Sequence, residues 1–248
     1  MDFISFIIPI RDKSDEACDL FAHLSKLYTR PEIIFVHQLN DMPFMRGQLM
    51  NIGCKTAKHP LFVLMDVDLR FYSKFDFVQK MAKHKRPFLP FNRIDCVDII
   101  NGRQVISGVR GPSSGGMCCI TRKQFASTCG FSNLCMGWGG EDDIFAKRAK
   151  FIRFDNVILH VNHLRAKLPV GYRDYNKEII KSASHRLPTH DGIGQLTYEL
   201  TNRIPDPVVG AVNIGVKKIG VRSDYRYMEE YTMVTEFHLE SQNNEERS

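Results

Sequence analysis

Three consecutive carboxylates, Glu141, Asp142 and Asp143, directly follow a glycine-rich segment in the second half of the chain. Adjacent acids repel one another, so a fold that buries them without a purpose loses stability. One of them could act as a general base that takes the proton from an attacking hydroxyl, while the others accept hydrogen bonds from hydroxyl groups. Acidic residues also stabilise the first turn of a helix, and the two interpretations are compatible.

The only tryptophan, Trp138, lies just before these acids, between Gly137 and Gly139. Glycines let the backbone approach a ligand closely. Most single tryptophans pack in a core. One that is set between glycines and carboxylates is also suited to stacking against the face of a sugar, and this is the role we predict.

A second acidic pair, Asp66 and Asp68, ends the apolar run 61–65. This pattern predicts a buried strand that emerges at a ligand crevice. Two acids at this spacing are often only turn residues. The functional alternative is a site for a divalent cation, Mn²⁺ or Mg²⁺, which would neutralise the charge that develops on a departing diphosphate.

His160 and His163 are candidate metal ligands. Their spacing puts both side chains on one side of a helix or tight turn, although not on one side of a regular strand. An isolated pair of this kind is more often structural, but this pair ends a strand-like run just after the acidic segment. With Asp68 it would form a set of one carboxylate and two imidazoles, which favours Mn²⁺.

Hydrophobic periodicity predicts strand, helix, strand, helix, strand over the first seventy residues. The strands cover 3–10, 32–38 and 60–68, and the helices cover 14–28 (with Ser14 as N-cap) and 46–58. This order indicates the βαβαβ half of a nucleotide-binding sheet with parallel strands, whose ends meet at one ligand edge. Arg11 and Arg46 could hydrogen-bond diphosphate or ribose oxygens there, or remain solvated.

The second half mixes strands and helices. The predicted strands are 88–98, 103–109, 117–121 and 151–161, and the predicted helices are 75–84, 123–128, 142–150 and 191–203. We expect an α/β protein with one domain, residues 1–216, in which 1–70 bind the nucleotide and 71–216 hold the acceptor and the metal. Residues 217–248 form a polar, acidic C-terminal tail.

Composition excludes several classes of protein. An apolar content of 43% is that of an ordinary globular protein, and no apolar run approaches the length of a membrane span. The net charge is +6, and the acidic residues of 228–248 leave +11 on 1–227, which suits an anionic partner. No signature of a nucleic-acid-binding module accompanies it. Seven cysteines without a CxxC pair and the lack of a secretory signal predict reduced thiols and a cytoplasmic location.

Four segments together resemble the β-1,4-galactosyltransferase family of inverting glycosyltransferases, which have the GT-A fold. In order along the chain they are 7–12 (IIPIRD), 44–53 (FMRGQLMNIG), 64–69 (LMDVDL), and 130–131 (GF) with 137–143 (GWGGEDD). A weaker fifth match is 191–198. The likeness extends from about residue 6 to residue 216. Polypeptide GalNAc-transferases and chondroitin-type polymerases share parts of the pattern.

The resemblance implies a role for each matching position. Asp142 would be the catalytic base. The nucleotide or the donor sugar would contact Pro9, Arg11, Phe44, Arg46, Asp66, Val67, Gly116 and Glu141. The acceptor would contact Trp138, Gly139 and Asp143. Asp68, His160 and His163 would bind Mn²⁺, with Mg²⁺ as the alternative, and His160 stands where the well-known animal enzymes have methionine.

Two departures from the family matter. Pro112, Ser113 and Ser114 stand where the animal enzymes place aromatic residues that restrict the donor pocket, so that the small Ser113 would admit an N-acetyl group. The cysteine pattern and membrane anchor of those enzymes are not recognisable, which favours a cytosolic enzyme of a bacterium or virus. Residues 164–190 match poorly, and they leave the acceptor open.

The sequence therefore predicts a metal-dependent inverting transferase. It would move galactose or N-acetylgalactosamine from a UDP-sugar to a hydroxyl of a saccharide or glycoconjugate, with β linkage. The alternative is a carbohydrate-binding or inactive relative, and a nucleic-acid binder ranks third. We expect no nucleic-acid partner and no integral membrane segment.

Overall fold

The computed structural model describes residues 3–101, 103–111, 113, 115–137, 139–162, 172–183 and 191–221. Within 172–183 it describes the side chains of 175–181, and it does not describe that of Val221. Trp138 and His163, for which the sequence predicts sugar stacking and metal binding, lie outside the described residues. So do Pro112, Ser114 and the predicted tail from residue 222 onward.

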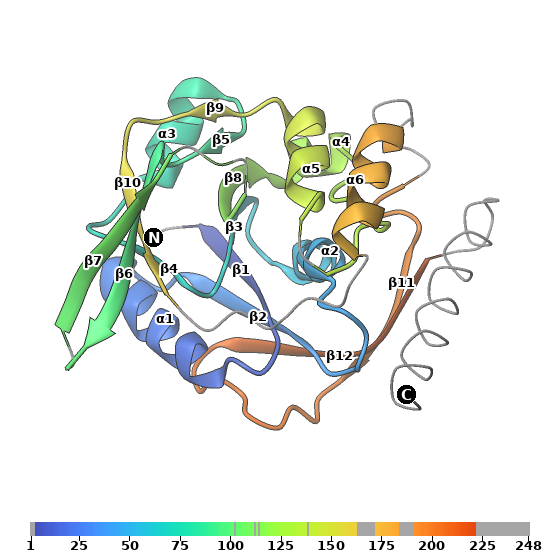
Figure 1. The fold of residues 1–248 in the computed structure, drawn as a ribbon, viewed down its shortest axis with the longest axis horizontal. Helices are drawn as coiled ribbons and strands as arrows, with labels where there is room; N and C mark the ends of the chain where they lie inside the picture. The colour runs from blue at the N-terminus through green and yellow to red at the C-terminus, as the bar shows by residue number, and fades with distance from the viewer. Residues whose placement is uncertain are drawn as a thin grey trace, which may run out of the picture.

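A large mixed sheet forms the centre of the fold (Figure 1). Its middle consists of the parallel strands β2 (Glu32–Gln38), β1 (Ile4–Ile10) and β3 (Leu61–Met65), linked by α1 (Ser14–Leu27) and α2 (Arg46–Thr56). This confirms the predicted βαβαβ half. Every residue of β1 and β3 is buried, which is why these strands read as continuous apolar runs rather than as alternating patterns.

The rest of this sheet is built from later segments. Beside β3 lie β8 (Met117–Thr121), β5 (Phe88–Leu89) and β9 (Ile152–Arg153), and beside β2 lie β12 (Val212–Val221) and β11 (Leu196–Thr201). β8 is antiparallel to β3, whereas β12 is parallel to β2. The large sheet is therefore mixed, with parallel strands at its centre.

A second, smaller sheet has the strand order β4 (Leu69–Phe71), β10 (Val157–Val161), β6 (Arg93–Ile100) and β7 (Arg103–Arg110). In its register Leu69 pairs with His160. Asp68 directly precedes β4, so this pairing brings the predicted carboxylate and imidazole together from segments about ninety residues apart.

The described ranges hold four further helices: α3 (Phe77–His84), α4 (Arg122–Ser127), α5 (Glu141–Ala149) and α6 (Tyr172–Ala183). In Figure 1, α2, α5 and α6 gather on one side of the view, and the β6–β7 hairpin lies on the other. α5 packs against both α2 and α6.

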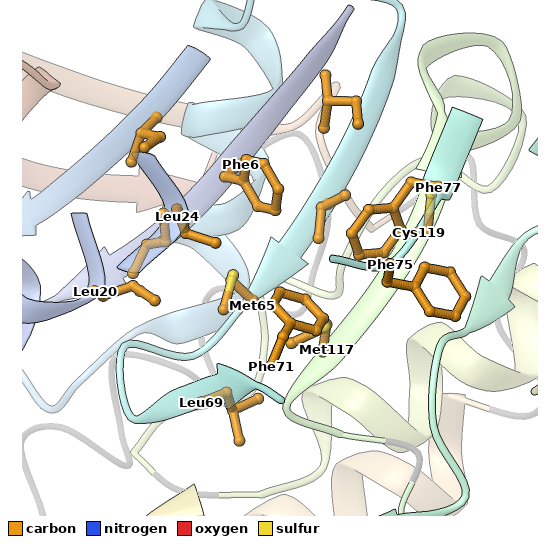
Figure 2. Close-up of a cluster of buried hydrophobic side chains, with 14 of the residues drawn as sticks. Phe6, Leu20, Leu24, Met65, Leu69, Phe71, Phe75, Phe77, Met117 and Cys119 are labelled. Atoms are coloured by element: carbon orange, nitrogen blue, oxygen red, sulfur yellow. The ribbon is translucent and has the colours of Figure 1, made fainter. Parts of the chain in front are cut away.

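Two apolar clusters lie on opposite faces of the large sheet. Phe6 and Ile8 of β1 join the cluster under α1, which is rich in aromatic rings (Figure 2), whereas Ile7 joins the cluster under α2. This alternation is the period of two expected for a strand covered on both faces. Gly53 lets α2 approach closely, because a Cβ at this position would clash with the side chain of Ile7.

Four local predictions are wrong. The single strand predicted at 88–98 is divided between the two sheets, because β5 pairs with β8 and β9 whereas β6 pairs with β10 and β7. The predicted helix 191–203 is instead a turn followed by β11, because Gly192 and Gly194 disfavour a helix and Leu196–Thr201 pairs with β12. The single strand predicted at 151–161 is divided between the two sheets, as β9 and β10. Ser14 is the first residue of α1 rather than its N-cap, which is Lys13.

Two further segments differ from the expected organisation. α6 lies in the stretch 164–190, for which no element was predicted. β12 crosses the predicted domain boundary at residue 216 and ends at Val221, because its pairing with β11 continues to that residue.

The loop between α4 and α5 is tied to α2 by buried side-chain amides. Asn51 donates from Nδ2 to the carbonyl oxygen of Phe131 (3.0 Å) and accepts from the backbone N–H of Phe131 (2.9 Å). Gln48 donates from Nε2 to the carbonyl oxygens of Asn133 (2.7 Å) and Cys135 (3.1 Å). The loop that leads into the acidic helix α5 is therefore fixed to the helix that begins at Arg46.

A second set of contacts holds the same loop from the other side. Asp191 accepts from the backbone N–H of Asn133 (2.8 Å) and pairs with Arg148 of α5 (3.1 Å), and both side chains of this ion pair are buried. Asn176 of α6 bonds both the N–H and the carbonyl oxygen of Met136. These contacts fix the position of α5 relative to the sheet.

Substitution Asn51→Ala should destabilise the protein by about 3 kcal/mol. It leaves the buried N–H and C=O of Phe131 without their partner, and each unsatisfied group costs about 1–3 kcal/mol. The free energy of unfolding from urea denaturation measures the loss. The matched control is Asn92→Ala, whose side chain bonds Asp155 near the surface and which should cost less than about 0.5 kcal/mol. Equal losses in the two variants would refute the role of the tether.

Candidate active site

One guanidinium gathers three carboxylates at the ligand edge of the large sheet. Arg46, the first residue of α2, pairs through Nε with Asp66 Oδ1 (2.5 Å). Its Nη1 pairs with Asp142 Oδ1 (2.7 Å) and lies 3.5 Å from Glu141 Oε1. The two acidic clusters of the sequence therefore converge in space, from the end of β3 and from the start of α5.

Two glycines make this convergence possible. Gly115 lies so close to Asp142 that a Cβ on it would overlap the carboxylate. Gly116 has φ +89 and accepts at its carbonyl oxygen from the backbone N–H of Asp66 (2.8 Å). A Cβ at Gly116 would lie 3.8 Å from Asp66 Oδ2. The loop before β8 thus lines the cluster, where the sequence predicts a donor pocket.

The three acids of the triplet have different surroundings. The side chain of Asp142 is 25% exposed, that of Glu141 is 7% exposed, and Asp143 is exposed at the surface. Glu141 and Asp142 both contact Arg46. Asp142 is therefore the member that both faces the cluster and remains accessible to a reactant.

Burial raises the pKa values of these carboxyl groups. The pKa of Glu141 rises to about 8, because burial and the neighbouring charge of Asp142 outweigh Arg46. The pKa of Asp66 rises to about 6, with burial again as the main cause. The pKa of Asp142 is also raised by burial, against the opposing effect of Arg46 and of a hydrogen bond from the backbone N–H of Gly116. Since Asp68 lies next to Asp66, the site keeps excess negative charge even when Glu141 is protonated.

Asp68 and His160, two of the predicted metal ligands, lie close together. His160 Nε2 lies 3.6 Å from Asp68 Oδ2, and the backbone N–H of Val161 donates to the carbonyl oxygen of Asp68 (2.8 Å). Two donor atoms this far apart can share one cation at bond lengths of about 2.1 Å. The two residues therefore fit a divalent cation. Within the described ranges no cluster of three His, Cys, Asp or Glu side chains could hold a metal ion, and His163 falls outside those ranges.

The turn that carries both aspartates is rigid. Val67 between them is 4% exposed, and the guanidinium of Arg70 donates to the carbonyl oxygens of Val67 (2.7 Å) and Leu69 (2.9 Å). Arg70 is itself buried. We infer that Val67 acts as the anchor of this turn, and its predicted contact with the donor stays a prediction.

The predicted nucleotide contacts lie at the end of β1 and beside it. Pro9 is buried in β1, and Phe44 packs at the edge of the cluster under α2. Arg11 Nη2 donates to the carbonyl oxygen of Asn40 (3.3 Å), and burial lowers the pKa of Arg11. Its buried Nε has no hydrogen-bond partner in the described part of the chain, so it could serve an oxyanion.

For two other predicted residues, Arg46 and Gly139, the structure gives less direct support for a ligand contact. Nε and Nη1 of Arg46 bind carboxylates, so its contact with a nucleotide remains a prediction. Gly139 has φ +95, and a Cβ there would meet no described atom within 4 Å, which leaves room for a ligand.

Sequence reasoning missed the residues that position the site. They are Gln48, Asn51, Asn176, Asp191 and Gly115. Gln48 and Asn51 carry a usable signal, since two amides on the wholly buried stretch 46–54 of α2 must find partners inside the protein. The structural role of Asp191 depends on its ion pair with Arg148, which the sequence does not reveal.

Sequence comparisons identify related proteins. Residues 110–168 match the family described as the N-terminal domain of galactosyltransferase. Beta-1,4-galactosyltransferase 4 of Mus musculus is 31% identical over 237 residues, which cover 85% of this chain and 62% of the mouse protein. The chain thus spans less than two thirds of this relative.

Solved structures show the same fold at low sequence identity. Drosophila beta-1,4-galactosyltransferase 7, as a mutant in complex with manganese, UDP-Gal and xylobiose, has a TM-score of 0.59 at 18% identity. The alignment covers 89% of this chain and 94% of that one. GalNAc-T7 with UDP, GalNAc and Mn²⁺ has a TM-score of 0.53 at 12% identity, over 75% of this chain and 51% of that chain.

In the described ranges no helix is both long and apolar enough to cross a bilayer. The chain is an α/β protein with the GT-A fold. Its sequence is similar to those of the β-1,4-galactosyltransferases.

Proposed function

We propose that this protein is a metal-dependent inverting glycosyltransferase. It moves galactose or N-acetylgalactosamine from a UDP-sugar to a saccharide hydroxyl, with β linkage. The observation that carries the proposal is the bridge of Arg46 between Asp66 and Asp142, which joins the predicted donor side to the predicted base. The similarity to β-1,4-galactosyltransferases supports the same activity.

Asp68, His160 and His163 would hold the Mn²⁺ or Mg²⁺ ion. When bound, this ion would neutralise the negative charge that grows on the diphosphate as the sugar departs. The excess of carboxylates over guanidinium at the site suits a divalent cation. Imidazole beside carboxylate favours Mn²⁺ over Mg²⁺.

Asp142 is the proposed general base. It is accessible, and burial raises its pKa above that of an ordinary aspartate, which makes the carboxylate a stronger proton acceptor. Arg46 fixes Oδ1 by the 2.7 Å contact, and the ionised carboxylate keeps further lone pairs with which to accept the proton. The acceptor hydroxyl then attacks the anomeric carbon on the face opposite the diphosphate, which inverts the configuration.

Glu141 holds a proton at neutral pH, since its pKa is about 8. Its buried Oε2 has no hydrogen-bond partner in the part of the chain that the structure describes. A protonated carboxyl can donate one hydrogen bond and accept others, so it matches a sugar hydroxyl. We assign Glu141 to the donor sugar.

Two points of the proposal concern specificity and location. Both UDP-galactose and UDP-N-acetylgalactosamine are candidate donors, because Ser113 is small. All seven cysteines are free and five are buried, which agrees with a reducing compartment such as the cytoplasm. Transfer rates measured under the same conditions with UDP-galactose and with UDP-N-acetylgalactosamine determine the donor specificity.

Asp142→Asn should lower the transfer rate by about 10²–10⁴-fold, because the amide cannot accept the proton. It should retain wild-type affinity for UDP with Mn²⁺, since the amide can still accept from Arg46. Steady-state transfer assays and calorimetric titration with UDP measure the two effects. Asp143→Asn on the same turn should instead raise the acceptor KM and leave kcat near the wild-type value. A fully active Asp142→Asn variant refutes the assignment, and a wild-type protein that binds sugar without transfer would support the carbohydrate-binding alternative.

Asp68→Ala should abolish the Mn²⁺-dependent part of UDP binding. Chelation of the metal should have the same effect on the wild-type protein, and added Mn²⁺ should reverse it. Asp155→Ala, at the surface loop between β9 and β10, is the matched control and should bind like the wild type. Affinity for UDP with Mn²⁺ that survives in Asp68→Ala would exclude this ligand.

Glu141→Gln should change how stability depends on pH. The folded protein keeps the proton of Glu141 up to about pH 8, whereas the unfolded chain releases it near pH 4.5. Wild-type stability should therefore fall relative to the variant between these values as the pH rises, by up to about 1.4 kcal/mol per pH unit. Urea denaturation of both proteins from pH 5 to 8 tests this. Glu178→Gln, at an exposed position of α6, should show no such divergence.

A further inference from the structure

Asn162, just after β10, is held by the β6–β7 hairpin. Its Nδ2 donates to Asp98 Oδ1 of β6 (2.7 Å) and to Ser107 Oγ of β7 (2.8 Å), and its backbone N–H donates to the carbonyl oxygen of Val97 (2.8 Å). An ionised carboxylate only accepts hydrogen bonds. Asp98 therefore fixes which end of the Asn162 amide carries the hydrogens.

This orientation assigns the tautomer of His160. With Nδ2 directed to the hairpin, Oδ1 of Asn162 faces His160 Nδ1 at 3.2 Å. An amide oxygen accepts, so Nδ1 must carry the proton. In the neutral imidazole the lone pair then lies on Nε2, the atom 3.6 Å from Asp68 Oδ2.

We propose that Asn162 is a positioning residue for the cation site. It sets the tautomer and the ring orientation of His160, so that the Nε2 lone pair and the Asp68 carboxylate are offered to one divalent cation. The His160 and Asp68 side chains are 12% and 14% exposed, so their geometry is set by the protein. The proposal rests on the cation of the proposed function. A ligating histidine generally donates its second ring N–H to such a partner.

A β-bulge places the second anchor of Asn162. The register of β6 and β7 shifts between Cys96 and Val97, so that Ser107 is the extra residue on β7. Its hydroxyl donates to the carbonyl oxygen of Cys96 (3.3 Å) and accepts from Asn162. Bulges commonly redirect a side chain beside a functional site. The hairpin, which lies beside β10 in Figure 1, thereby becomes part of the support of the cation site.

The test compares wild type with Asn162→Leu, which keeps the side-chain size and removes the hydrogen bonds. Long-range ¹H–¹⁵N correlation spectra of the metal-free proteins report the His160 tautomer directly. We expect Nδ1–H in the wild type and a loss of this preference in the variant. Titration with Mn²⁺ in the presence of UDP, followed by electron paramagnetic resonance, should show binding about 10–100-fold weaker in the variant. Thermal denaturation verifies that the variant is folded.

Two further variants complete the design. Asp98→Asn lets the Asn162 amide turn over and should weaken Mn²⁺ binding in the same direction. Asn156→Ala changes an asparagine at the other end of β10, whose side-chain oxygen accepts from the backbone N–H of Val157, and should bind Mn²⁺ like the wild type.

The outcomes separate this inference from the proposed function. An Nε2–H tautomer in the wild type, or unchanged Mn²⁺ affinity in a folded Asn162→Leu variant, overturns the role of Asn162 alone. Failure of the wild-type protein to bind Mn²⁺ with UDP overturns the cation site and the proposed function with it.

Discussion

The structure depends on one charge cluster, in which the Arg46 guanidinium holds three carboxylates that would otherwise repel one another. Removing four ionisable groups from water is costly, and a single positive charge does not balance the three acids. The cluster persists because the surrounding fold fixes its members, and because protonation of Glu141 relieves part of the repulsion. The remaining negative charge makes the site receptive to a cation and to hydroxyl groups.

Helix α2 explains how the fold withstands this repulsion. Arg46 begins the helix, and Gln48 and Asn51 in its next turns hold the loop that leads to Glu141. Gly53, further along, lets the helix lie close to β1. One short helix therefore supplies the counter-charge, the tether and the close packing. This gives a physical reason for the spacing of arginine, asparagine and glycine in the segment 44–53.

Hydrophobic periodicity predicted correctly those helices and strands that depend mainly on local interactions. The βαβαβ half follows from continuous apolar runs and amphipathic helices, and the place of Asp66 at the ligand edge follows from the edge at which parallel strands end. The remaining strands depend on pairing with segments that are distant in the sequence. Leu196–Thr201 became a strand because β12 is available as its partner, and the predicted strand 151–161 was divided because its two ends join different sheets. The partners of Arg46 and Asp191 likewise belong to segments whose meeting no spacing reveals.

The two aspartates of the turn after β3, Asp66 and Asp68, belong to different halves of the site. Asp66 faces Arg46 and the base, while Asp68 faces His160 and the smaller sheet. Arg70 and the buried Val67 hold the backbone of this turn, so each of the two carboxylates keeps its own direction. Activation of the acceptor and stabilisation of the leaving diphosphate would thus share one rigid turn. A substitution in the β6–β7 hairpin would therefore alter the proposed cation site through Asn162. It would leave Asp142 in place, because α2 and α5 hold that residue.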